Sequence, residues 1–298
     1  MTLCILAGCA FFTTGCWNGR LLVCAEQPYW TSLGDDLRVR ASLALASLPK
    51  GYIPRVLVVG APAGLSKTVA GGRFGTVVVG PLISLEAFEL ARAFPRTRFL
   101  LVGVSPGAEA PPNAAVLVFT RADAFRAAGY AAGQSVLGEA GGAGAPGARI
   151  GVLAAAGTDA AARDRDAFAG GVSDALGGAL PVAREIDAPI DRAKAKAAVE
   201  QMRKDGVEIV LLRLGAADPW CLEAMKEAGG CAVVSDWASS RAYPAQVFLS
   251  VEDDLIGGIA RFLDRAARGN RVVDGPVLLV EGEARKVPED ARAKGGAR

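Results

Sequence analysis

The feature of the sequence that most constrains its fold is a repeated alternation between short apolar segments and segments with helical character. Val77–Val79 and Phe99–Val102 are continuous runs of Val, Leu and Phe, with no polar residue at alternate positions. Runs of this kind are typical of strands buried on both faces, as in parallel sheets that helices cover on both sides. The short links between strands and helices indicate open α/β sheets.

The same pattern predicts individual elements along most of the chain. We expect strands at residues 21–25, 56–59, 76–79, 98–102, 116–119, 150–153, 182–186, 207–212, 232–234, 247–249 and 276–280. We expect helices at residues 36–48, 84–94, 158–176, 190–204, 219–228 and 251–268, and a low-complexity loop at residues 138–147.

The stretch Ala114–Ala132 divides this pattern. A strand, a polar turn at Thr120–Asp123 and an Ala-rich helix follow one another there, and similar strand–helix units stand on both sides. We interpret the stretch as the first of three crossings between two lobes, with later crossings at residues 238–246 and 269–275. The predicted fold class is therefore α/β, with two doubly wound three-layer lobes joined by a three-segment hinge.

This interpretation assigns the chain to lobes. The N-terminal lobe is expected to hold residues 20–119 and 245–268, and the C-terminal lobe residues 120–244 and 270–285. Residues 286–298 are expected to form a frayed tail. Ligands of open α/β sheets bind beyond the carboxyl ends of the strands, so we expect the function to lie in the cleft between the lobes.

The composition argues against several classes of function. The 33 Lys and Arg residues nearly balance the 31 Asp and Glu residues, so we expect no nucleic-acid partner. The sequence contains no histidine, which excludes a His-dependent triad, a His general base and a His-ligated zinc within it. Gly60–Thr68 is similar to a P-loop, but Ser66 stands before Lys67 where that motif needs glycine. We therefore expect no catalytic residue, no metal and no cofactor.

The N-terminal segment and the cysteines indicate where in the cell the protein is located. Residues 1–16 form an apolar run that is too short to span a bilayer and resembles a secretory signal peptide. Two positions resemble the lipobox, the short motif that ends in the cysteine to be lipidated. We favour Cys16, because a full apolar run precedes it, with Cys9 as the alternative; a buried first strand at residues 1–16 is a further alternative. Cys221 and Cys231 flank a predicted helix, and we favour two ordinary thiols there over a disulfide.

Four segments, taken in order, carry a resemblance to a known family. They are Val118–Phe119 followed by Ala127–Gly133, then Arg163–Gly171, Val233–Asp236 and Val247–Val251. Over roughly residues 20–285 the chain resembles the type I periplasmic binding proteins, and within them the basic membrane protein (BMP) family of solute-binding lipoproteins. The sequence departs from that family at Glu252 and Asp253, where a lysine near the ligand is common, and this puts a nucleoside ligand in question.

The resemblance implies a protein that captures a small molecule rather than transforming it. Such a protein lies on the extracytoplasmic face, is held to the membrane by a lipid anchor, and delivers its ligand to the permease of an ABC importer. Its ligand is held between two lobes, by stacked aromatic rings and by carboxylate or guanidinium groups.

Six residues are candidates for binding the ligand: Tyr29, Trp30, Ser84, Arg163, Asp236 and Trp237. The aromatic rings would stack on the ligand, and a carboxylate would accept hydrogen bonds from its hydroxyl or amide groups. Each role has a structural alternative. Tyr29 and Trp30 would otherwise form a hydrophobic lid. Ser84 and Asp236 would otherwise cap helices, and Arg163 would form a surface ion pair.

We therefore expect an extracytoplasmic solute-binding lipoprotein for a small, polar, ring-bearing ligand such as a nucleoside, a flavin-like vitamin or a sugar. A ligand-sensing receptor with the same two-lobed core is the first alternative. A small α/β enzyme is the second, and the absence of histidine and of a phosphate-binding glycine motif argues against it.

Overall fold

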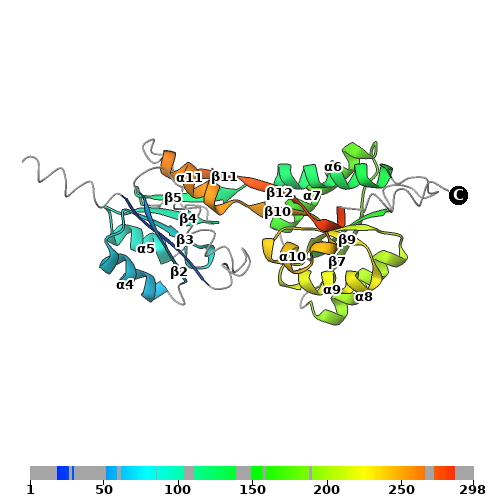
Figure 1. The fold of residues 1–298 in the computed structure, drawn as a ribbon, viewed down its shortest axis with the longest axis horizontal. Helices are drawn as coiled ribbons and strands as arrows, with labels where there is room; N and C mark the ends of the chain where they lie inside the picture. Colours follow the sequence, from blue (N-terminus) through cyan, green and yellow to red (C-terminus); the bar gives the residue numbers. More distant parts are fainter. Residues whose placement is uncertain are drawn as a thin grey trace, which may run out of the picture. The chain divides into compact units, whose positions relative to one another are not determined.

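The computed structural model describes residues 19–26, 29, 52–58, 62–84, 86–103, 111–138, 149–156, 159–187, 190–265 and 272–285. The chain forms two compact units (Figure 1). Unit 1 comprises Met1–Thr120 and Asp254–Pro276, and unit 2 comprises Arg121–Asp253 and Val277–Arg298. The chain passes between the units three times, so the predicted class of two α/β lobes joined by a three-segment hinge is confirmed.

Unit 1 is built on a sheet with the strand order β11-β5-β4-β3-β1-β2, in which every pairing is parallel. The strands are β1 (Arg20–Ala25), β2 (Ile53–Val58), β3 (Thr76–Val79), β4 (Arg98–Val102), β5 (Ala114–Phe119) and β11 (Val272–Gly275). The described helices of this unit are α4 (Pro62–Gly72), α5 (Glu86–Ala93) and α11 (Leu255–Arg265), with a short 3-10 helix η1 (Pro81–Ile83).

Both faces of this sheet are buried, because successive residues of a strand point to opposite faces. Leu22 packs on one face with Leu65 of α4 and Leu90 of α5. Leu21 packs on the other face with Phe262 of α11. The continuous apolar strands of the sequence thus serve two cores, one on each side of the sheet.

Unit 2 is built on a second sheet with the order β12-β10-β9-β8-β6-β7. All its pairings are parallel except that between β10 and β12, which is antiparallel. The strands are β6 (Ile150–Ala155), β7 (Val182–Ile186), β8 (Ile209–Arg213), β9 (Cys231–Val234), β10 (Val247–Asp253) and β12 (Val277–Glu281). The helices are α6 (Ala122–Gly138), α7 (Asp159–Ala175), α8 (Arg192–Lys204), α9 (Asp218–Ala228) and α10 (Trp237–Ala242), with 3-10 helices η3 (Gly215–Ala217), η4 (Pro244–Gln246) and η6 (Glu283–Arg285).

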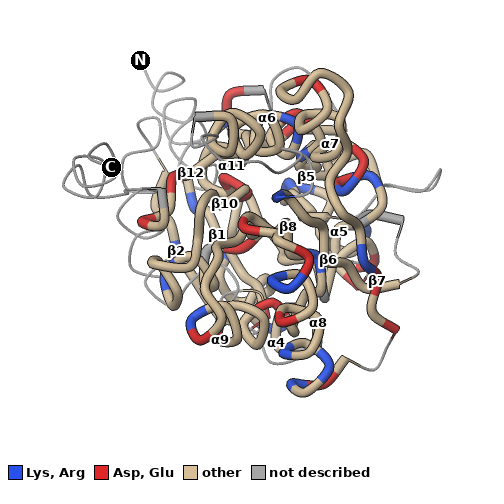
Figure 2. The backbone as a smooth tube through the Cα atoms, turned by 90° about the vertical axis from the view of Figure 1, so that its right-hand side faces the viewer, with Lys and Arg blue, Asp and Glu red and all other residues tan. Residues whose placement is uncertain are grey.

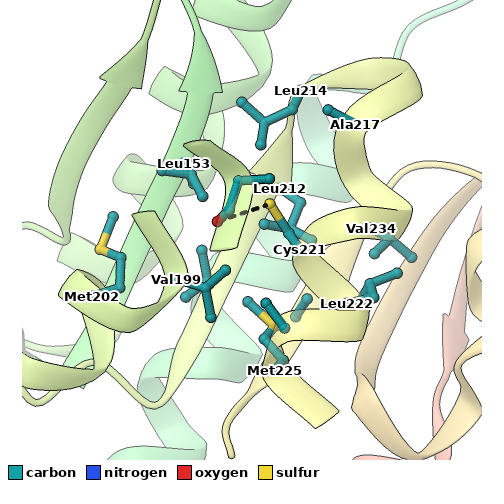
Figure 3. Packing of buried hydrophobic residues seen from close by; sticks show 14 of the residues in the cluster. Leu153, Val199, Met202, Leu212, Leu214, Ala217, Cys221, Leu222, Met225 and Val234 are labelled. Carbon is teal, nitrogen blue, oxygen red and sulfur yellow. Dashed lines mark hydrogen bonds between the residues drawn. The ribbon is translucent and has the colours of Figure 1, made fainter. Parts of the chain in front are cut away.

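Helix α8 shows how the sequence specifies these elements. Asp191 precedes it in an extended conformation, and its side chain accepts a hydrogen bond from the backbone N–H of Lys194 at 2.8 Å, which caps the first turn. Ala195, Val199 and Met202 recur at helical spacing and are buried. They pack with Cys221 and other residues of α9 against the sheet of unit 2 (Figure 3).

The opposite face of this second sheet is covered by α6 and α7, which approach each other closely. A Cβ atom added at Gly171 of α7 would lie 1.9 Å from the carbonyl oxygen of Arg126 in α6. A Cβ atom at Gly129 of α6 would lie 2.1 Å from the carbonyl oxygen of Phe168 in α7. Gly129 and Gly171 belong to two of the four segments that carry the family resemblance, and the contact gives a physical reason for glycine there.

Cys221 and Cys231 are not joined by a disulfide, as predicted. Cys221 is fully buried, and its Sγ lies 4.0 Å from the carbonyl oxygen of Ala195, the contact dashed in Figure 3. Burial raises the pKa of the Cys221 thiol to about 12, with a smaller contribution from Asp218. A thiol of this kind stays protonated and serves as an apolar packing group.

The structure corrects several predicted boundaries. The strand expected at residues 247–249 was assigned to the N-terminal lobe, but β10 pairs with β9 and β12 in the second sheet. Residues 238–246, expected to be a crossing, form α10 and η4 within unit 2. β10 continues to Asp253, so the helix expected from residue 251 begins at Leu255. Residues 272–275 form β11 instead of a crossing, and helix α4 was not predicted.

Some predictions lie outside the described residues. They are the signal peptide and lipobox at residues 1–16, the helix at residues 36–48 and the tail at residues 286–298.

Candidate functional site

Polar and charged residues of unit 2 gather at the carboxyl ends of its parallel strands. Arg213 is the last residue of β8, Ser235 and Asp236 follow β9, and Asp253 is the last residue of β10. These ends meet at one edge of the sheet, because the three strands are parallel neighbours. In the described part of the chain, charges of both signs are interspersed along the backbone (Figure 2).

Arg213 forms a nearly buried ion pair with Asp164 of α7. Its Nη2 lies 2.6 Å from Asp164 Oδ2, and the two side chains are 14% and 12% exposed. The guanidinium group also donates a hydrogen bond to Ser235 Oγ and lies 5.4 Å from the centre of the Phe125 ring. Its Nε is buried and has no hydrogen-bond acceptor among the described residues, so one donor of this group remains available.

A second ion pair, between Arg121 and Asp253, interacts electrostatically with Asp164 of the first pair. Arg121 donates two hydrogen bonds to the carboxylate of Asp253, at 2.8 and 2.6 Å, in the bidentate geometry that guanidinium groups favour. Burial raises the pKa of Asp164, whereas the charges of Arg213 and Arg121 act to lower it. The four side chains of the two ion pairs together carry two positive and two negative charges when all are ionised, so the charges of the pairs balance.

Two further carboxylates border this cluster. Asp236 caps α10, because its Oδ1 accepts a hydrogen bond from the backbone N–H of Ser239 at 2.6 Å. Asp218 is 2% exposed and accepts a hydrogen bond from the backbone N–H of Leu214 at 2.8 Å. Burial raises the pKa of Asp218 to about 7; the bond from Leu214 opposes that shift, and the charge of Asp236 adds to it.

The corresponding edge of unit 1 holds a buried carboxylate. Glu26 directly follows β1 and is 8% exposed. Neither oxygen of its carboxylate has a hydrogen-bond partner in the part of the chain that the structure describes. The side chain lies close to Gly80, which follows β3: a Cβ atom on Gly80 would be 3.0 Å from Glu26 Oε2.

The predicted site residues occupy different environments. Tyr29 packs against the core on one face of the first sheet. Ser84 is fully buried, and its Oγ lies 2.7 Å from the carbonyl oxygen of Gly80 and 3.2 Å from that of Val79. Arg163 is exposed on α7, one residue before Asp164. The side chain of Trp237, together with Trp30 and the predicted lipidation site Cys16, lies outside the described residues. Ligand binding by these residues stays a prediction.

Two of the predicted residues lie beside the cluster of unit 2: Asp236 directly follows Ser235, and Arg163 precedes Asp164, whose pKa its charge acts to lower. Arg213, Asp164 and Glu26 were missed as candidates. The sequence could have indicated Arg213 and Glu26 as candidates, since each is the first charged residue at the end of a buried apolar strand. The sequence does not indicate Asp164 as a candidate, because only the fold brings α7 over β8.

No group of three or more potential metal ligands occurs among the described residues. Within the same part of the chain, no helix has the length and apolar character to cross a membrane.

Comparison with known proteins gives similarity in structure but not in sequence. No family model and no curated protein matches the sequence. A transcriptional activator of the comK gene from Bacillus halodurans is similar over 93% of this chain and 94% of its own, with 15% identity and a TM-score of 0.68. An ABC transporter solute-binding protein from Conexibacter woesei is similar over 92% of this chain and 93% of its own, with 18% identity and a TM-score of 0.66.

This chain has the type I periplasmic binding protein fold. A carbohydrate-transporter solute-binding protein from Agrobacterium radiobacter, solved with D-arabinose, shares it over 92% of this chain and 97% of its own, with 12% identity and a TM-score of 0.56. None of these three structures is described as an enzyme. At such identities the periplasmic-binding-protein fold is shared, and function has to be argued from the site.

Proposed function

We propose that this protein binds a small polar solute at the carboxyl ends of its strands and delivers it to an ABC importer, without transforming it. The observation that carries the proposal is the buried Nε donor of Arg213, which has no acceptor among the described residues although Asp164, Ser235 and Phe125 fix the rest of the guanidinium group. Buried polar groups in native proteins are nearly always paired, so a fixed, unpaired donor at this edge indicates a ligand atom.

The proposal includes the location and family predicted from the sequence. We infer an extracytoplasmic protein of the BMP family that is anchored by a lipid on Cys16, with the ABC permease as its partner. The two solute-binding proteins of the same fold support the transport role. Incorporation of radiolabelled palmitate by the protein, and its loss in a Cys16→Ala variant, would test the anchor.

The ligand class that we favour is a hydroxyl-rich ring. Paired Arg and Asp side chains offer donors and acceptors side by side, as vicinal hydroxyl groups require. The structure that was solved with D-arabinose supports a sugar as the first candidate.

The decisive experiment is native mass spectrometry of protein purified without refolding. We expect a bound compound that is released on denaturation, and calorimetry with that compound then gives its affinity. An Arg213→Lys variant keeps the charge beside Asp164 but loses the Nε donor, and we expect its affinity to fall about tenfold. Arg184→Lys is the matched control, since Arg184 is an exposed arginine paired with Asp205 in the same unit. Equal affinities of both variants and the parent would contradict the site.

A ligand sensor is the second candidate, because a transcriptional activator shares the fold over 94% of its length. A sensor would pass its ligand-bound state to a signalling partner. Uptake of labelled ligand that depends on this protein in its own cells would distinguish import from sensing.

A further inference from the structure

The strand β12 forms one edge of the second sheet, and its exposed side chains are apolar. It pairs with β10 on one side and with no other strand of the described chain (Figure 1). Leu278, Leu279 and Val280 are 46%, 39% and 37% exposed, although they follow one another in the strand. Because successive residues of a strand point to opposite faces, apolar side chains are exposed on both faces of this edge.

The other edge strands of the two sheets carry residues that hinder pairing. β2 contains Pro54 and Arg55, β7 contains Arg184 and Glu185, and β11 contains Asp274. Charged side chains and proline on an edge strand are common protection against pairing with another chain. The first four residues of β12 include neither. The edge formed by β12 therefore has the character of a site to which a further strand can be added.

The backbone of β12 directs hydrogen-bonding groups away from β10 at every second residue. The N–H of Gly282 donates to the carbonyl oxygen of Phe248 at 3.0 Å. At the other end of the strand, the carbonyl oxygen of Pro276 accepts a bond from the chain that follows β10, at 2.9 Å. Bonds to a neighbouring antiparallel strand recur at alternate residues, so the N–H and C=O groups of Val277 and Leu279 point to the outer edge.

We propose that β12 pairs with β12 of a second copy of this chain, about a two-fold axis at Leu279. A two-fold axis perpendicular to the sheet makes the paired strands antiparallel, and this register pairs all five residues of the strand. Leu279 then lies opposite its equivalent, and Leu278 lies opposite Val280, so apolar side chains meet on both faces. Glu281 lies opposite Val277, which keeps the two glutamates at opposite ends of the pair.

The expected association is weak, because five residues from each copy form a small contact. Contacts at the low end of interface sizes are typical of transient complexes, so we expect dimers in equilibrium with monomers. This inference goes beyond the proposed function and requires no ligand. Solute binding and pairing through β12 can each fail without the other.

Sedimentation equilibrium of the full chain, over about a hundredfold range of protein concentration, tests the pairing. We expect the parent to change from monomer to dimer as its concentration rises. Leu279→Lys and Leu279→Glu each place like charges directly opposite each other, so each should lower the association constant at least about tenfold. Leu180→Lys is the matched control, because Leu180 is a leucine of the same unit that is 67% exposed and lies outside the strands.

An equimolar mixture of Leu279→Lys and Leu279→Glu is the sharper test. Opposite charges then face each other across the two-fold axis, so the mixture should associate again although neither variant does so alone. A folding defect of the separate variants could not produce this recovery, and a mixture that stays monomeric would contradict the pairing.

Two further results would overturn the proposal. A parent that is monomeric at every concentration would do so, as expected if another protein or residues 286–298 of the same chain occupied the edge instead. Dimerisation that Leu279→Lys and Leu279→Glu both retain in full would place the contact elsewhere on the molecule.

Discussion

The carboxyl group of Asp218 illustrates how burial of one residue sets a pH dependence. Its pKa in the fold is about 7, against an ordinary value of 3.8, because burial disfavours the charged form. The folded protein therefore holds a proton that the unfolded chain releases between these two values. The stability contributed by the protonated group is fully present below pH 3.8 and is lost as the pH rises through about 7.

An Asp218→Asn variant should therefore lose part of the pH dependence of unfolding. The amide oxygen can still accept the hydrogen bond from Leu214, but it cannot ionise. At pH 8 we expect the variant to be more stable than the parent by up to about 4 kcal/mol, with a smaller difference at pH 5. Urea denaturation at the two pH values measures both differences. An unchanged profile for Asp218→Asn would refute the prediction.

Asp236 allows capping and ligand binding to be separated at a single residue. Its side chain caps α10, and asparagine caps helices about as well as aspartate does. We expect Asp236→Ala to lower the free energy of unfolding by about 1 kcal/mol and Asp236→Asn to leave it nearly unchanged. If Asp236 also binds the ligand, both variants should lose affinity in calorimetry. Full affinity in Asp236→Asn would leave only the capping role.

At the scale of elements, the crossing of α6 and α7 makes a sharp prediction about two adjacent glycines. Gly171→Ala would place its Cβ atom 1.9 Å from the backbone carbonyl oxygen of Arg126, so the helices would have to separate. We expect a loss of about 1–3 kcal/mol or more. At Gly170 the nearest atom within 4 Å is a flexible guanidinium nitrogen of Arg126, at 4.0 Å. Gly170→Ala should therefore be neutral or stabilising by up to about 1 kcal/mol, and equal effects of the two substitutions in chemical denaturation would contradict the packing described.

The elements themselves were largely predictable, because strands such as β3 and β4 are buried on both faces and carry continuous apolar runs. The errors occurred where the local pattern is ambiguous. Val251–Asp253 extends β10 in the structure. In the sequence, this segment lies next to the amphipathic sequence of α11 and is equally compatible with the first turn of that helix. β11 was missed because Val272–Gly275 has only two apolar side chains and is fixed by pairing with β5, far away in the sequence.

For the molecule as a whole, the fold was easier to predict than the site. The order of strands and helices follows from local periodicity, whereas the ion pair of Arg213 and Asp164 depends on how α7 lies over the sheet. The lack of a hydrogen-bond partner for Glu26 among the described residues likewise depends on its surroundings, which the sequence does not display. Asp236 was predicted because it directly follows a strand end, where ligands of α/β sheets bind.

Solute binding makes a prediction for the whole molecule. A ligand that binds only the folded protein stabilises it by mass action, by about 2.7 kcal/mol at a concentration of 100 times Kd. We expect the unfolding temperature to rise steadily with the logarithm of the concentration of the compound found by mass spectrometry. An unfolding temperature that does not depend on that concentration would show that the compound is not bound by the native state.

The late position of β11 has a consequence for how the polypeptide acquires its native state. Val272 pairs with Val116, so all of α6 through β10 is synthesised before the edge strand that completes the first sheet becomes available. Such distant pairing slows folding, because a long loop has to close before the contact forms. As the nascent chain emerges, the second sheet can assemble from β6 to β10 while the first still lacks its last strand and α11. The first sheet is therefore completed only after β6 to β10 have been synthesised, although its strands β1 to β5 come earlier in the sequence, and the second sheet then still awaits β12.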